Sequence, residues 1–358
     1  MIAVVKVGSS SVTEETVERL CGEVAAARDN GHTVVVVTSG AIAAGWDALD
    51  PEGERQRPAD PAVLQAVSAV GQHRLMRTWD EHLSTHGLVA GQVLLAPLDF
   101  VHRQQYLHAR QTLTRLLELG VVPVVNENDA VADDEIRFGD NDRLAALVAH
   151  LVGAHTLVLL TDTAGVFTAD PRLDGQASLI EEIVSIDAEL ESSAGGAGSE
   201  RGSGGMASKL AAAKIASWSG VRAVIAAASR PGVLADAVAG RAGIGTVVRP
   251  HERRLPARKL WIAFAVGASG TVIVDDGARA ALVEGGRSLL PAGVVGVQGR
   301  FDADDAVEIA TADGRVFAKG LVRHGAATVS AWAGRRTADL PAEMAHEVVH
   351  RDDLVVLP

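Results

Sequence analysis

Two lysines stand where the sequence could bind phosphate. The chain has only five lysines; Lys6 comes just before Gly8-Ser9-Ser10, and Lys209 ends the glycine- and serine-rich segment 202–209. Backbone N–H groups at such loops and helix starts bind phosphate oxygens, and lysine adds a compact positive charge. The alternative is chance placement of two surface lysines. The pattern predicts that both ammonium groups contact a phosphoryl group, although neither segment matches the Walker P-loop pattern.

A second polar region is the stretch NENDAVADDEIRFGDND, residues 126–142, which holds seven carboxylates and one arginine. Short amides and acids gather at its two ends, 126–129 and 140–142, and this clustering indicates a site that fixes a polar ligand. Residues 133–135 are expected to be a solvated loop. Asp162 follows the apolar run 157–161 and precedes a turn of small residues. It suits recognition of a nucleotide's base or ribose hydroxyls, or it caps a turn.

The elements that must position these residues alternate between strands and helices. Buried strands are predicted at 2–7, 34–37, 121–125, 156–160 and 223–227. Thr13, followed by Glu14 and Glu15, is the predicted N-cap of the first helix. Continuous apolar strands separated by helices imply an α/β fold with a mainly parallel sheet covered on both faces. Ligands bind such sheets at the carboxyl ends of the strands.

The pattern changes after a linker predicted at 249–258. Short strands are then predicted at 270–274, 306–309 and 327–330, separated by turn signals such as Asp313-Gly314. The sequence therefore predicts two domains, 1–248 and 259–358, and the second is small and mostly β.

Composition limits the function. The chain has 358 residues, is 47% hydrophobic and carries a formal net charge of −12. The charge argues against general affinity for nucleic acid or anionic membranes. There is no signal-peptide pattern and no apolar run long enough for a membrane span, so a cytoplasmic protein is expected. The single cysteine, Cys21, excludes an intramolecular disulfide and is expected to be an inert core thiol.

Two motif matches fail in their context. Gly202-x-Gly204-x-x-Ala207 fits the dinucleotide-binding pattern but follows a glycine- and serine-rich segment rather than a strand. His346–His350 reads H-E-x-x-H, the zinc-protease helix signature, but its valines and the following residues favour a strand. We therefore expect neither a nicotinamide site nor a zinc-protease site.

Together the polar segments resemble the amino-acid kinase family, and within it the glutamate 5-kinases. The matching segments in the first domain are VVKVGSSSVT, VVVVTSGAIAAG, VLQAVSAVGQ, VPVVNENDAV, FGDNDRLAALVA, LLTDTAGVFTADPR and GSGGMASKLAAA. In the second domain RKLWIAF, VDDGARAAL, SLLPAGVVGVQGRF and VVHRDDLVVL resemble the PUA fold.

The resemblance implies a three-layer kinase sandwich followed by a PUA-like domain. It implies ATP-dependent phosphorylation of the γ-carboxylate of L-glutamate, with Mg²⁺, as the first step of proline biosynthesis. It further implies feedback inhibition by L-proline, a homo-oligomer (dimer or tetramer) and transfer of the product to glutamyl-phosphate reductase.

Site residues are likewise implied by the resemblance. Lys6 and Lys209 would bind the transferring phosphoryl group, and Asp142 would orient the two lysines. Ser39, Asp129 and Asn141 would hold glutamate, with Asn141 donating to a carboxylate. The nucleotide site would be lined by Lys6, Thr161, Asp162, Ser203, Gly204, Gly205, Met206, Ala207, Ser208 and Lys209. The sequence departs from the family pattern at His108 and at 199–203.

Three other functions fit parts of the sequence less well. Acetylglutamate kinase shares the phosphate-binding segments, but the second domain and NENDAV argue against it. Aspartokinases normally carry ACT domains. PUA folds often bind RNA, but residues 259–358 hold ten Lys/Arg against thirteen Asp/Glu, which is a poor electrostatic match for RNA.

Overall fold

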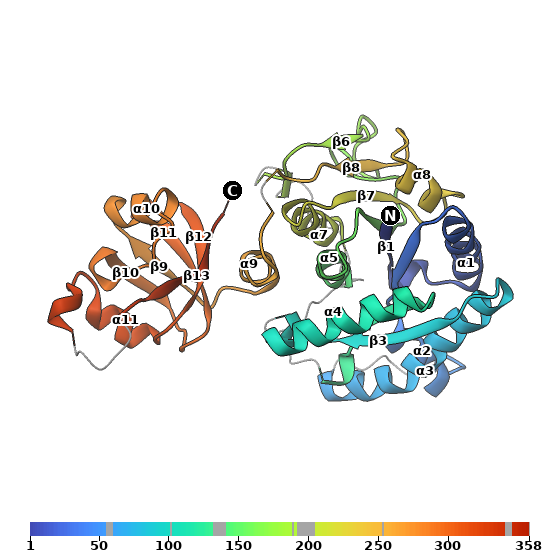
Figure 1. Cartoon of the computed structure of the whole chain (residues 1–358), viewed down its shortest axis with the longest axis horizontal. Coiled ribbons are helices and arrows are strands. Elements are labelled where there is room, and N and C mark those ends of the chain that lie inside the picture. Colours follow the sequence, from blue (N-terminus) through green and yellow to red (C-terminus); the bar gives the residue numbers. More distant parts are fainter. Residues whose placement is uncertain are drawn as a thin grey trace. The chain divides into compact units, whose positions relative to one another are not determined.

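The computed structural model describes residues 1–54, 60–100, 102–131, 141–187, 190–191, 205–252, 254–340 and 346–357. The chain divides into two compact units, Met1–Arg254 and Leu255–Pro358 (Figure 1).

The first unit is built on a sheet whose strand order in the described residues is β3-β4-β2-β1-β5-β7-β8-β6. From β3 to β7 every neighbouring pair is parallel, and β8 runs antiparallel to β7. The strands are β1 (Ile2–Val7), β2 (Thr33–Val37), β3 (Ala90–Leu95), β4 (Val122–Glu127), β5 (Thr156–Thr161), β6 (Glu182–Ile183), β7 (Arg222–Ala227) and β8 (Thr246–Val248).

Helices cover both faces of this sheet, as Figure 1 shows. The buried side chains of α1, α3 and α8 form one core with the strands, and α4, α5 and α7 contact the sheet as well. The helices are α1 (Glu14–Asp29), α2 (Ala41–Leu49), α3 (Pro61–Thr85), α4 (Arg103–Glu118), α5 (Asn141–Leu151), α7 (Met206–Trp218) and α8 (Val233–Ala239). Thr13 caps α1 as predicted, because its hydroxyl accepts from the Thr16 N–H at 3.2 Å.

Alternation along β1 places Lys6 on the opposite face from that core. Ala3, Val5 and Val7 belong to the cluster that includes α1, α3 and α8. Because successive side chains of a strand point to opposite faces, Lys6 projects toward the face where α5 contacts β1. Its burial, at 2% exposed, follows from its place in a central strand.

Two glycines allow α2 and α3 to pack backbone against backbone. A Cβ on Gly71 would lie 1.7 Å from the carbonyl oxygen of Ala41, and a Cβ on Gly45 would lie 2.0 Å from that of Val67. No side chain fits at either position. The contact fixes the position of α3 after Gly71 relative to α2.

The second unit contains a sheet of order β10-β9-β11-β12-β13, in which β9 and β11 are parallel and the other pairs are antiparallel. Its strands are β9 (Gly270–Val274), β10 (Val294–Gly299), β11 (Ala306–Thr311), β12 (Val316–Val322) and β13 (Val349–Val356), and its helices are α9 (Ala257–Leu260), α10 (Asp276–Val283) and α11 (Ala326–Trp332). The mostly β character of this unit is confirmed.

The strand predicted at 327–330 is wrong, because these residues lie in the helix α11. Val329 and Trp332 are buried and three positions apart, so they share one helical face. The interpretation of H-E-x-x-H is supported: His350 lies in the strand β13, and α-helical spacing of the two imidazoles does not occur. Among the described residues no group of three or more His, Cys, Asp or Glu could hold a metal.

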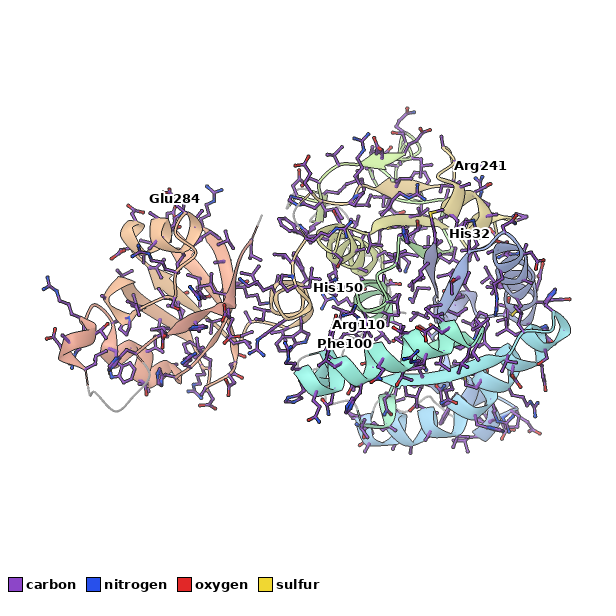
Figure 2. The ribbon with its side chains drawn as sticks, in the orientation of Figure 1. His32, Phe100, Arg110, His150, Arg241 and Glu284 are labelled. Carbon is purple, nitrogen blue, oxygen red and sulfur yellow. The ribbon has the colours of Figure 1, made fainter. Side chains whose placement is uncertain are left out.

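Two further titratable groups of the first unit are Cys21 and His150. Cys21 is fully buried in the core, and burial raises the pKa of its thiol to about 12, which fits an unreactive thiol. Near the end of α5, His150 lies close to Arg110 of α4 (Figure 2).

In the described part of the chain no helix is both long enough and apolar enough to cross a membrane.

Candidate active site

The polar residues of interest gather where the parallel strands end. Lys6 lies near the end of β1, Thr38 and Ser39 follow β2, Asn126 is the last residue but one of β4, and Thr161 is the last residue of β5. Because these strands are parallel neighbours, their carboxyl ends lie along one edge of the sheet. The helix α5 begins at the same edge with Asn141 and Asp142.

Lys6, Asp142 and Lys209 form a buried triad. The Nζ atom of Lys6 lies 2.7 Å from Oδ1 of Asp142, and Nζ of Lys209 lies 3.1 Å from Oδ2. The three side chains are at most 5% exposed. One carboxylate therefore holds two ammonium groups that are far apart in the sequence. Formally the three side chains carry a charge of +1, which favours an additional anion.

Helix packing brings the triad together. Asp142 is in the first turn of α5 and Lys209 in the first turn of α7, and these two helices lie side by side (Figure 1). Both helices contain small side chains that are fully buried, such as Ala145 and Ala149 of α5 and Ala213 of α7. The small residues allow the helices to approach closely, which brings the two charged first turns to the same place.

A chain of amide side chains lies next to the triad. The Nδ2 atom of Asn141 lies 2.6 Å from the carbonyl oxygen of Thr38 and 2.7 Å from Oδ1 of Asn126. Asn126 in turn donates to Oε1 of Gln72 at 2.7 Å. Ser39 Oγ lies 3.0 Å from the same Nδ2 atom.

The hydrogen bonds of Asn141 fix the orientation of its side-chain amide. Both hydrogens of its Nδ2 atom are directed to the closer acceptors on Thr38 and Asn126. These two bonds leave the amide oxygen of Asn141 for other partners, and the donation to a carboxylate that the resemblance implies stays a prediction. Thr38 is itself fixed, because its hydroxyl accepts from the Trp79 indole at 3.1 Å.

The glycine-rich segment leads into the N-terminus of α7. The N-cap residue, Gly205, supplies no side-chain hydrogen bond to the first turn. The hydroxyl oxygen of Ser208 in that turn is buried and has no hydrogen-bond partner among the described residues. Met206 and Ala207 complete the turn, and Ser203 and Gly204 lie outside the described residues. An oxyanion placed there would satisfy both the helix N–H groups and the Ser208 hydroxyl.

The end of β5 forms the next part of the edge. Thr161 is buried, and its hydroxyl donates to Oδ1 of the exposed Asp162 at 3.0 Å. Asp129 lies in the 3₁₀ turn η3 (Asp129–Val131), which contacts α3. Strand ends, helix starts and this turn thus contribute to one edge of the first unit.

Models of two known families match this chain. The model of the amino acid kinase family matches residues 1–227, and that of the PUA domain matches residues 270–343. The chain belongs to the amino acid kinase family.

Curated members of the amino acid kinase family match almost the whole chain. Glutamate 5-kinase of Pelobacter propionicus is 42% identical, over 99% of this chain and 97% of that protein. Glutamate 5-kinase of Mycolicibacterium vanbaalenii is 45% identical, over 99% and 96%. That of Nocardia farcinica is 45% identical, over 98% and 96%.

For this amino acid kinase, sequence reasoning did not find Gln72, Thr38 or Trp79. Gln72 is inside a helix and 54 positions from its partner Asn126, and no short motif marks such a pair. A periodic pattern gives a weak signal, since Gln72, Leu75 and Trp79 have the spacing of one helical face. His108, where the sequence departs from the family pattern, is exposed on α4.

Proposed function

We propose that this chain catalyses ATP-dependent phosphorylation of the γ-carboxylate of L-glutamate, giving L-glutamyl 5-phosphate and ADP. A γ-carboxylate oxygen forms a bond to the γ-phosphorus of ATP while the bond from that phosphorus to the β,γ-bridging oxygen breaks. The observation that carries the proposal is the buried triad, in which Asp142 holds Lys6 and Lys209 at the edge of the sheet. The glutamate 5-kinases named above support glutamate as the substrate.

This chemistry needs no general base. A glutamate carboxylate, with an ordinary pKa near 4.3, is ionised at neutral pH and can attack directly. Phosphoryl transfer then depends on in-line placement and on neutralising the charge of the equatorial oxygens. Fixed cations in a buried site supply this without reorganising during the reaction.

Each part of the edge is assigned a role. The ammonium groups of Lys6 and Lys209 contact the transferring phosphoryl group, and Asp142 positions them without touching substrate. The first turn of α7, with the Ser208 hydroxyl, binds phosphate oxygens of ATP. Thr161 and Asp162 bind the nucleoside part, and the segment Ser203–Lys209 lines the nucleotide site with them.

Ser39, Asp129 and Asn141 are assigned to glutamate. The carboxylate of Asp129 and the amide oxygen of Asn141 are acceptors, which suits the substrate's ammonium group. Ser39 precedes Gly40, which caps α2 in a left-handed conformation (φ 107°). The N-terminus of α2 therefore follows Ser39 directly, and its N–H groups favour a carboxylate.

Mg²⁺ is proposed to accompany ATP, as it does in most kinases. Magnesium usually keeps several waters and binds phosphates together with one or two carboxylates. The described residues contain no cluster of three or more metal-binding side chains, and phosphate oxygens and waters would supply most of its ligands. The ion would neutralise charge on the β- and γ-phosphates.

The wider roles are inferred from the family resemblance. We place the kinase chemistry in residues 1–248, the linker at 249–258 and a PUA-like domain with a structural or regulatory role at 259–358. L-proline is the proposed feedback inhibitor of a cytoplasmic homo-oligomer. A reductase that takes up the unstable acyl phosphate is the proposed next enzyme.

The test is ADP release with ATP and Mg²⁺ and a panel of acceptors: L-glutamate, N-acetyl-L-glutamate and L-aspartate, each with and without L-proline. Glutamate should be the preferred acceptor, and hydroxylamine should trap its product as a hydroxamate. Preference for N-acetylglutamate or aspartate would contradict the assigned substrate. Glutamate turnover that proline leaves unchanged would contradict the assigned inhibitor alone.

A further inference from the structure

We propose that Gln72 binds the α-carboxylate of the amino-acid substrate through its side-chain NH₂ group. The inference rests on the proposed function and adds a specificity-determining residue to it. It comes from the order of donors and acceptors along the buried amides of Gln72, Asn126 and Asn141.

A backbone carbonyl fixes this order. The carbonyl oxygen of Thr38 can only accept, so the amide atom 2.6 Å from it must be the nitrogen of Asn141. The same nitrogen lies 2.7 Å from Asn126, which must therefore present its oxygen. Asn126 then has its nitrogen toward Gln72, at 2.7 Å, and Gln72 must present Oε1. Reversing any one amide would place two acceptors or two donors against each other.

The consequence is a donor at the end of the chain. The Nε2 atom of Gln72 is buried and has no hydrogen-bond partner among the described residues. Buried amide groups are nearly always hydrogen-bonded, because leaving one unsatisfied is costly. Since Oε1 is held by Asn126, Gln72 cannot turn its amide over to find another partner. A ligand oxygen is the expected acceptor.

The position of Gln72 indicates which oxygen this is. The helix α3 contacts η3, which carries Asp129, the residue assigned to the substrate's ammonium group. Along the amide chain, Gln72 is separated by Asn126 from Asn141, the neighbour of Asp142 in the phosphoryl-binding triad. The γ-carboxylate of the substrate must lie at the triad, where phosphoryl transfer takes place. Its α-carboxylate is then expected at the other end of the amide chain, where Gln72 lies.

The backbone around Gln72 is fixed for such a role. It follows Gly71, whose missing side chain allows α3 to pack against the backbone of α2. The backbone of Gln72 is therefore held by the helix α3, and its side-chain amide is held by Asn126. The side chain then loses little conformational freedom when substrate binds.

The experiment compares wild type with Gln72→Glu, measuring KM for glutamate and for ATP at pH 8. A glutamate side chain keeps the oxygen that accepts from Asn126 but replaces the donor with an anion. We expect KM for glutamate to rise about 10- to 100-fold, as for loss of a hydrogen bond to a charged group. KM for ATP should change less than about 2-fold. A purely structural role would leave both values unchanged, because the bond to Asn126 is kept.

Three controls make the result specific. Gln111→Glu introduces the same charge on the exposed face of α4 and should behave as wild type. Gln72→Met removes donor and acceptor without adding charge, and it replaces Gln72→Glu if that variant does not fold. Competitive inhibition by 4-aminobutyrate, which is glutamate without its α-carboxylate, should be equally strong in wild type and Gln72→Glu.

The possible outcomes are distinct. A raised KM for glutamate with an unchanged inhibition constant for 4-aminobutyrate supports the inference. An unchanged KM for glutamate, or equal weakening of both molecules, overturns it and leaves the proposed function standing. A wild-type protein that does not phosphorylate glutamate overturns the proposed function, and this inference with it.

Discussion

Lys6 and Asp142 form an ion pair of 2.7 Å in which the lysine is 2% exposed and the carboxylate is fully buried. The pair joins the central strand β1 to the first turn of α5, so its geometry is set by core packing rather than by mobile loops. The second oxygen of Asp142 binds Lys209 of α7. Two cations are thus held in place before substrate arrives, which is the preorganisation that phosphoryl transfer needs.

The first prediction concerns the lysines. Replacing Lys6 or Lys209 with alanine should lower kcat about 10²- to 10³-fold, by analogy with the loss of one preorganised donor to a transition-state oxyanion. The matched control is Lys214→Ala, on the same helix as Lys209 but paired with the partly exposed Glu191. It should retain near-normal kcat in the ADP-release assay. Normal turnover in both Lys6→Ala and Lys209→Ala would refute the assigned mechanism.

The second prediction concerns Asp142. Asp142→Asn leaves two buried ammonium groups without the carboxylate that holds them, and removing one partner of a buried pair typically costs about 3–5 kcal/mol. Urea unfolding should therefore show a free energy of unfolding lower by about that amount. Glu191→Gln, which removes the partner of Lys214 in a partly exposed pair, should change it by less than about 1 kcal/mol. A comparable loss of unfolding free energy in the two variants would show that the buried triad stabilises the fold no more than a partly exposed ion pair does.

Much of the fold was predictable because buried parallel strands have a simple pattern. The five apolar runs predicted as strands correspond to β1, β2, β4, β5 and β7. The strand β3 was missed, since AGQVLL mixes small, polar and apolar residues and is mostly half-buried at the sheet's edge. In the second unit, residues 327–330 were predicted as a strand but lie in a helix. A short run with two adjacent β-branched residues is compatible with either structure. The burial of Val329 and Trp332 on one face is what favours the helix here.

The site was predictable to a smaller extent. Lys6, Asp142 and Lys209 stand beside glycine or amide clusters, so their neighbours in the sequence are enough to mark them. Gln72 has a single glycine beside it and no cluster, and its significance comes from a contact between a helix and a strand end. The direction of the Asn141 amide depends on the carbonyl oxygen of Thr38, and no sequence pattern encodes a backbone acceptor at that distance.

The third prediction concerns the contact of α2 with α3. Gly71→Ala would place a Cβ atom 1.7 Å from the carbonyl oxygen of Ala41, so the two helices must separate. Overpacking of this kind typically costs about 1–3 kcal/mol, and a clash with backbone belongs at the upper end. Gly175→Ala is the control, because a Cβ there meets nothing within 4 Å. Urea unfolding of both variants measures the difference; equal stabilities would mean that the helices do not pack as described.

The fourth prediction is a pH dependence of stability through His150. Burial, and then the nearby Arg110, lower the pKa of this imidazole from its ordinary value of 6.5, so the folded protein favours the neutral ring (Figure 2). The unfolded chain binds the proton more tightly. The stabilisation is therefore fully present above about pH 6.5 and is lost as the pH falls through the lowered folded pKa, by at most about 1.4 kcal/mol per pH unit.

His150→Gln removes this titration, so its free energy of unfolding should fall less than that of wild type below about pH 6.5, and the two slopes should agree above it. Arg110→Met tests the second cause: without the guanidinium the folded pKa moves back toward 6.5, and the acid loss becomes smaller than in wild type. Urea unfolding at a series of pH values separates the cases. Identical slopes for wild type and His150→Gln throughout would mean that His150 takes up its proton as readily in the folded protein as in the unfolded chain.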